Sequence, residues 1–209
     1  MVIQEKTHTD IVVDTTIPRT WDGRLAYVIS QIASPPVLAI AAMALIAATL
    51  SSPRAWTWAG VYVVLAILAP ILYLVWLVHR GRVTDLDVQL REQRTAPLIF
   101  TVACAGLAWL VLMLGRAPVQ MIVVAGGLWL QMVLIFGITL RWKISVHSAA
   151  AAGIATLAWS LAGTVLPLVI GVPLIAWARV RLRRHTIAQT IAGSVLGLTI
   201  FLVALLMAC

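Results

Sequence analysis

The sequence is dominated by long apolar runs, each about as long as a membrane is thick, with short polar turns between them. A helix needs about 20 apolar residues to cross the roughly 30 Å of hydrocarbon in a bilayer. Hydrocarbon offers the backbone no hydrogen-bond partner, so such runs must be helices or strands of a closed barrel. These runs lack the alternation of barrel strands. We therefore predict an all-α, polytopic integral membrane helical bundle.

We predict six to seven spans in a single membrane domain that covers residues 1–209. A polar N-terminal segment, 1–27, precedes the bundle of residues 28–208, and its mixed composition is not that of a signal peptide. The predicted spans lie near 28–50, 57–79, 97–115, 118–140, 146–162, 165–179 and 187–208. The fifth and sixth of these are short, so they form either two spans or one helical hairpin that does not fully cross.

The basic residues fall almost entirely on one side of this topology. Thirteen Lys and Arg residues lie in the N-terminal segment and in the turns at 80–96, 141–145 and 179–186, against only Arg54 and Arg116 on the other side. Cytoplasmic loops of membrane proteins are enriched in Lys and Arg. We therefore predict that the N-terminus and the basic side face the cytoplasm, in a membrane of the cell inner membrane type.

The acidic residues are confined to the first part of the chain. All seven Asp and Glu residues lie within the first 92 positions, so the remainder carries eight cations and no carboxylate side chain. This balance suits an anionic ligand such as a phosphate or a lipid headgroup. It argues against enzymes that bind a metal diphosphate through aspartate clusters, such as aspartate-rich prenyltransferases and CDP-alcohol phosphotransferases. We expect no metal, no cofactor and no nucleic acid.

Three polar islands, at 85–97, 143–147 and 179–189, meet the membrane on the predicted cytoplasmic side. Each arginine or histidine in them, taken singly, is most simply an interfacial anchor. Together they favour a binding site, because His147 and His185 each lie beside cations and each begins a predicted helix, whose first amides attract anions. Phosphoryl transfer without a metal needs cations, a nucleophile and an acid, and these islands supply all three.

Two of the islands resemble the motifs of the type 2 phosphatidic acid phosphatase superfamily, whose lipid phosphatases are related to vanadium haloperoxidases. The family motif Ser-Arg-x5-His-x3-Asp has its counterpart in Arg179, His185 and Gln189, with alanine before the arginine and glutamine in place of the aspartate. The family motif Pro-Ser-Gly-His is matched by "ISVH", which keeps Ser145 and His147.

The third family motif, Lys-x6-Arg-Pro, is degenerate in this chain. Arg94 stands at the position of the arginine, but Thr95 follows it instead of proline. The position of the family lysine falls on Asp87, so Arg91 would have to replace that lysine. The resemblance as a whole covers residues 85–193, about half of the chain.

The resemblance implies a role for each matched residue. His185 would be the nucleophile that forms a phosphohistidine, and His147 would protonate the leaving oxygen. The phosphate would be held by Arg94, Arg91, Ser145 and Arg179, with Lys143 as a further candidate. Gln189 can accept a hydrogen bond from His185, as the family aspartate does, but it brings no negative charge.

The predicted function is a metal-independent membrane phosphatase that hydrolyses a lipid or isoprenoid mono- or diphosphate through a phosphohistidine. The alternative, favoured by the uncharged Gln189, is a catalytically weak or inactive member of the same fold that serves as a lipid-binding or structural subunit of a membrane complex. The expected partners are membrane lipids, the phosphorylated substrate and, for the alternative, a membrane-protein partner.

If Arg179 and His185 bind the same phosphate, the backbone between them cannot be a continuous helix. On one continuous helix, Arg179 and His185 would lie about 240° apart around the axis and could not face one phosphate. We therefore predict that the chain breaks into a turn between these two residues.

Overall fold

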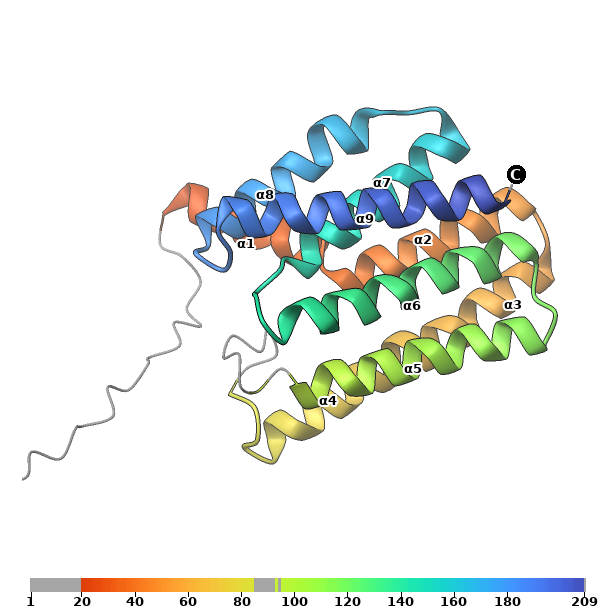
Figure 1. The fold of residues 1–209 in the computed structure, drawn as a ribbon, viewed down its shortest axis with the longest axis horizontal. Helices are drawn as coiled ribbons and strands as arrows, with labels where there is room; N and C mark the ends of the chain where they lie inside the picture. The colour runs from red at the N-terminus through yellow and green to blue at the C-terminus, as the bar shows by residue number, and fades with distance from the viewer. Residues whose placement is uncertain (1–19, 85–92, 94, 209) are drawn as a thin grey trace, which may run out of the picture.

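The computed structural model describes residues 20–84, 93 and 95–208, and the described part of the chain is entirely helical apart from its turns. The helices, in chain order, are α1 (Trp21–Ile32), α2 (Pro35–Leu50), α3 (Pro53–Tyr62), η1 (Val63–Leu68), α4 (Ala69–His79), α5 (Thr95–Leu114), α6 (Val119–Thr139), α7 (Val146–Ala162), η3 (Pro167–Gly171), α8 (Val172–Arg181) and α9 (Ile187–Ala208). The long helices α5, α6 and α9 run along the longest axis of the molecule (Figure 1).

Four helical segments are long and apolar enough to cross a membrane: Pro53–His79, Thr95–Leu114, Val119–Thr139 and Ile187–Leu206. The pair α1 and α2 makes a fifth if it is counted as one span, although the two helices are bent by 48° at their junction. Helix α7, of 17 residues, is apolar but shorter. The fold is thus an all-helical bundle with four to five candidate spans, and these helices are consistent with an integral membrane protein.

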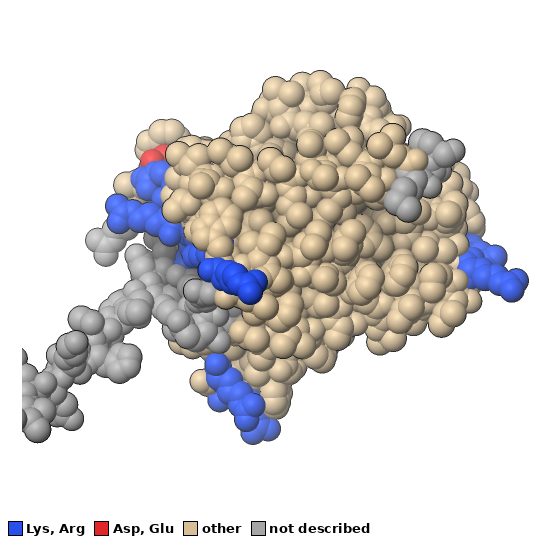
Figure 2. All heavy atoms as spheres, viewed as in Figure 1, with Lys and Arg blue, Asp and Glu red and all other residues tan. Residues whose placement is uncertain are grey.

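The surface has the polarity that a membrane requires. Lys and Arg gather at the two ends of the molecule in Figure 2, and the wide belt between the ends shows none in this view. Large apolar side chains are exposed on the helices, among them Leu72, Leu110, Val169 and Val203. Exposed apolar surface on this scale is unfavourable in water and favourable against lipid chains.

Two helices contain a π-helical turn, and each such turn lies just before a proline. Helix η1 ends two residues before Pro70, and η3 ends two residues before Pro173. Proline has no N–H to donate to the preceding turn, and its ring crowds the carbonyl four residues earlier. A widened turn relieves this crowding without ending the helix, so Pro53–His79 stays continuous.

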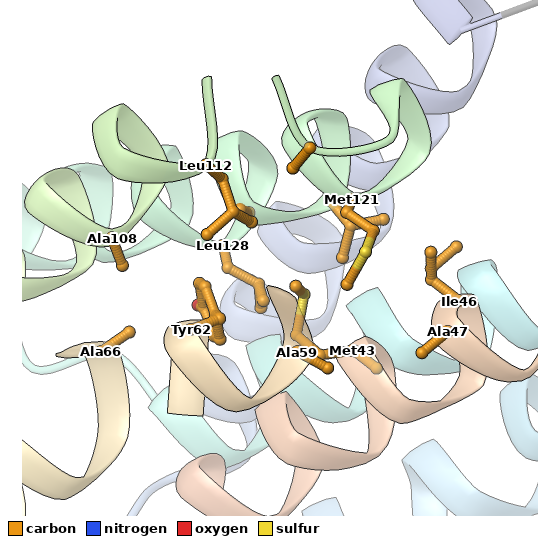
Figure 3. Packing of buried hydrophobic residues seen from close by; sticks show 14 of the residues in the cluster. Met43, Ile46, Ala47, Ala59, Tyr62, Ala66, Ala108, Leu112, Met121 and Leu128 are labelled. Carbon is orange, nitrogen blue, oxygen red and sulfur yellow. The ribbon is translucent and has the colours of Figure 1, made fainter. Parts of the chain in front are cut away.

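The central packing joins small residues to a few large ones. Met43, Tyr62, Leu112 and Met121 are buried where α2, α3, α5 and α6 meet, with alanines between them (Figure 3). Small residues let transmembrane helices approach closely, which increases van der Waals contact where no water can drive association.

The closest approach is between α7 and α9. A Cβ atom added to Gly193 would overlap the carbonyl oxygen of Ser145, and one added to Gly197 would overlap the carbonyl oxygen of Ala149. Both obstacles are backbone atoms, which cannot rotate away. The two glycines of α9 therefore fix its distance from the first two turns of α7.

We expect Gly197→Ala to destabilise the bundle by roughly 1–3 kcal/mol, because α9 must move away from the α7 backbone. The matched control is Gly137→Ala on α6, where an added Cβ meets nothing within 4 Å. That control is expected to be neutral or slightly stabilising, since alanine favours a helix. Thermal unfolding in detergent measures both, and equal midpoints for the two variants would contradict the proposed packing constraint.

Candidate active site

A cavity of about 460 Å³ opens at the end of the bundle where α8 ends and α7 and α9 begin, which we call the charged end. Three of the predicted site residues line this cavity: His147, Arg179 and His185. They come from the first turn of α7, the last turn of α8 and the connection between α8 and α9. Residues of the α1–α2 junction, including Gln31 and Ser34, complete the polar part of the wall. The structure therefore brings residues from two separate sequence islands to one cavity.

The predicted turn between Arg179 and His185 is confirmed. Helix α8 ends at Arg181, Arg183 adopts a left-handed backbone with φ of 54°, and α9 begins only at Ile187. The backbone N–H groups of Arg184 and His185 donate to the Arg179 carbonyl at 3.0 and 3.3 Å. This reversal returns His185 to the end of α8 that carries Arg179.

Arg179 is held inside the protein rather than at its surface. Its side chain is only 6% exposed, and one guanidinium nitrogen donates to Ser30 Oγ of α1 at 2.7 Å. Two residues further along α8, Arg181 forms an ion pair of 2.7 Å with Asp22 at the other end of α1. Helix α1 is thus bonded to α8 at two points. The bond between Ser30 and Arg179 fixes the Arg179 guanidinium at the cavity.

The His147 imidazole lies in the first turn of α7, at the charged end of the bundle and outside the four spans. Burial, then the neighbouring Arg179 and His185, hold the pKa of His147 well below its ordinary value, while a hydrogen bond with the Ser30 backbone acts in the opposite direction. The ligand-free imidazole is therefore neutral near pH 7. Ser30 contacts both Arg179 and His147, although nothing in the sequence of α1 had marked it as a site residue.

The orientation of His185 is set by a helix cap. The Thr186 backbone N–H donates to Gln189 Oε1 at 3.1 Å, and the Gln189 N–H donates to Thr186 Oγ1 at 3.3 Å, which is a capping box at the start of α9. The same Oε1 lies 3.1 Å from His185 Nδ1. A backbone N–H only donates, so the amide atom facing it is the acceptor oxygen, and His185 Nδ1 must carry the proton. In the neutral form of His185 the lone pair is then on Nε2.

Ser145 is placed beneath the cavity and does not line it. Its side chain is fully buried and caps α7, with Oγ accepting from the Ser148 N–H at 3.3 Å and from the Ser148 hydroxyl at 3.0 Å. Its backbone N–H donates to the Gln189 carbonyl at 3.2 Å. Ser145 thus joins the start of α7 to the first turn of α9 and positions the two histidines relative to each other.

Of the remaining predicted phosphate ligands, the structure describes only Lys143. Lys143 lies partly buried on the α6–α7 connection and is not among the residues that line the wall. Arg91 and Arg94 lie outside the described residues. Within the described ranges, no three His, Cys, Asp or Glu side chains group closely enough to hold a metal ion.

A second cavity, of about 180 Å³, adjoins the first inside the bundle, and the two walls share Pro35, Pro36, Ile71, Leu74, Pro97, Thr101 and Val146. Residues of α2, α3, η1, α4, α5, α6 and α7 line this second cavity, and its wall is almost wholly apolar. A polar mouth with an apolar extension matches a ligand that has a charged headgroup and an apolar chain.

Replacing Arg179 with glutamine is expected to raise the pKa of His147 toward its ordinary value, because a neighbouring positive charge is removed. The pKa is measured by NMR titration of the protein labelled with ¹⁵N-histidine in detergent. Arg82→Gln, an exposed cation outside the cavity, is the control and should leave the His147 titration in place. An unchanged His147 titration in Arg179→Gln would mean that the two side chains are not neighbours.

Comparison of the chain with protein-family models, with curated proteins and with solved structures gives no match, so the site has to be interpreted from its own chemistry.

Proposed function

We propose that the protein is a metal-independent membrane phosphatase that hydrolyses a lipid or isoprenoid mono- or diphosphate. The observation that carries this proposal is the meeting of His147, Arg179 and His185 at the mouth of one cavity whose interior is apolar. The proposal also agrees with the motif resemblance to the type 2 phosphatidic acid phosphatases, in which the corresponding residues perform this chemistry.

In the proposed reaction, His185 Nε2 attacks the phosphorus atom while the Nδ1 proton stays on the hydrogen bond to Gln189. The bond from phosphorus to the leaving oxygen breaks, and His147 gives that oxygen a proton. Water then attacks the phosphohistidine and gives a proton to His147, the phosphorus–nitrogen bond breaks, and phosphate is released with the His185 imidazole and the protonated His147 restored. The Arg179 guanidinium binds the phosphoryl oxygens, and its bond to Ser30 fixes it in place before substrate arrives.

The low pKa of His147 has a clear consequence for this scheme. The free imidazole is neutral and cannot act as an acid, but a bound phosphate dianion offsets the positive charge of Arg179 and stabilises the imidazolium. Substrate binding would thereby raise the pKa of His147 and supply the proton. The general acid is then formed only when a phosphate is present.

We place this chemistry in a bundle of six to seven spans, in which the η3–α8 segment and α7 supply the additional crossings, with the first turn of α7, which carries His147, at the membrane surface. We further propose a membrane of the cell inner membrane type, with the N-terminus and the cavity mouth toward the cytoplasm. This orientation is supported by the many basic residues at the cavity end. Arg80 stacks on Trp76 at 5.6 Å from the ring centre, as expected of an interfacial anchor.

The second candidate is a lipid-binding or structural subunit that keeps the cavity without turnover. It is favoured by Gln189, whose hydrogen bonds with Thr186 give it a structural reason to be present, and which adds no negative charge to support a positive imidazole on His185. Such a subunit would bind membrane lipids and another membrane protein.

The test of the proposal is phosphate release in detergent with EDTA, from farnesyl diphosphate and from a short-chain phosphatidate. We expect turnover that vanadate inhibits and that falls at least about 1,000-fold in His185→Ala, because the nucleophile is lost. His79→Ala, at the end of α4 and away from the cavity wall, is the control. Full turnover in His185→Ala would exclude the assigned nucleophile, and absence of turnover from the folded wild type would favour the second candidate.

A second prediction concerns the missing charge. Gln189→Glu preserves the capping box and the length of the side chain but adds a carboxylate beside His185 Nδ1. We expect turnover to rise about tenfold or more, because the carboxylate stabilises the positive imidazole during attack. Gln120→Glu, exposed on α6, adds the same charge elsewhere and should change nothing. A folded Gln189→Glu protein with unchanged turnover would show that this charge does not limit the reaction.

A further inference from the structure

The apolar interior of the cavity contains one polar side chain that its surroundings do not explain. Gln131 of α6 is 2% exposed and lines the inner cavity of about 180 Å³. Its Oε1 is fully buried and has no hydrogen-bond partner among the described residues. Tyr62, also 2% exposed, brings a phenol to the wall of the same cavity and points toward α6 beside Leu128 (Figure 3).

An unbonded amide at this place is costly to the fold. A buried carbonyl that has lost water without gaining a partner destabilises the folded state, and surrounding hydrocarbon gives it no substitute. A leucine or methionine would fill the same volume on α6 without this cost. The position therefore calls for a partner that the described residues do not provide.

The position of Gln131 relative to the mouth limits what that partner can be. Thr139 lies at the mouth, on the same helix and eight residues further along, which is about 12 Å along the helix axis. The two cavities adjoin, because they share lining residues of α2, α4, α5 and α7. A ligand with its phosphate beside Arg179 would thus lie with its chain along α6. Its chain would reach Gln131 about 12 Å from the mouth.

The chemistry of the amide selects the group on the chain. An amide offers both a carbonyl acceptor and an N–H donor, and a hydroxyl can bond to either of them. A charged amine or carboxylate would lose its hydration in this apolar cavity and is unfavourable there. We propose that the inner cavity binds a hydroxyl group on a single-chain lipid phosphate, about 12 Å from its phosphate, and that Gln131 is the residue that selects it. The inference rests on the proposed function only for placing the phosphate at the mouth.

The experiment measures binding without turnover, in protein that carries His185→Ala so that both probes stay intact. The probes are dodecyl phosphate and the same lipid with one hydroxyl on the distal third of its chain, titrated in detergent while thermal unfolding is followed. We expect the hydroxylated probe to bind about three- to tenfold more tightly. Adding Gln131→Leu should remove this preference, while Gln120→Leu, an exposed glutamine on the same helix, should keep it.

The stability of the ligand-free protein separates selection from a structural role. Gln131→Leu should raise the unfolding midpoint, because it removes an unbonded polar group. A lower midpoint together with no preference for the hydroxyl would mean that Gln131 holds an internal water for the fold, and would overturn the inference. Equal binding of the two probes to the parent would overturn it as well. Tyr62→Phe, which removes only a hydroxyl from the cavity wall, tests the same preference if Gln131→Leu does not fold.

The two proposals fail in different ways. A hydroxyl preference that depends on Gln131, in a protein that releases no phosphate, would leave the binding site standing and exclude the phosphatase. Phosphate release with equal binding of both probes would support the phosphatase and exclude the hydroxyl-binding site.

Discussion

The close packing of α7 against α9 is the constraint on which the rest of the site depends. Gly193 and Gly197 let the backbones of α9 and α7 approach at Ser145 and Ala149. A side chain at either glycine position would overlap a carbonyl oxygen of α7 or of its N-cap. The approach allows the Ser145 N–H to reach the Gln189 carbonyl, so the first turns of both helices begin at the same level. His147 and His185 are side chains of those two starts, and their proximity follows from the glycines.

Helix α8 supplies what this pair lacks, the cation Arg179, and helix α1 fixes it in place. Ser30 bonds the Arg179 guanidinium, and the same serine's backbone meets His147. Burying a guanidinium in this way is favourable only where hydrogen bonds compensate for lost water, and a phosphate in the adjoining cavity would add charge-assisted ones. The site therefore combines a fixed cation with a histidine whose pKa is lowered by burial and by that cation.

The two parts of the cavity differ in polarity. Its mouth carries the cations at the charged end of the bundle, and its interior is apolar until Gln131 and Tyr62. Helices α2, α4, α5, α6 and α7 contribute to both parts of the wall, while α1 and α8 line only the mouth.

The sequence alone determined the membrane bundle, the basic end and the need for a turn after Arg179, because these follow from hydropathy, charge and helical periodicity. It also marked His147, Arg179 and His185. Only the tertiary structure decided that Ser145 caps α7, that Ser30 holds the arginine, and that Gln131 lines the inner cavity with its Oε1 unbonded among the described residues. Those facts depend on which helix faces lie together at long range, and a single apolar helix, uniform around its axis, carries no signal for that choice.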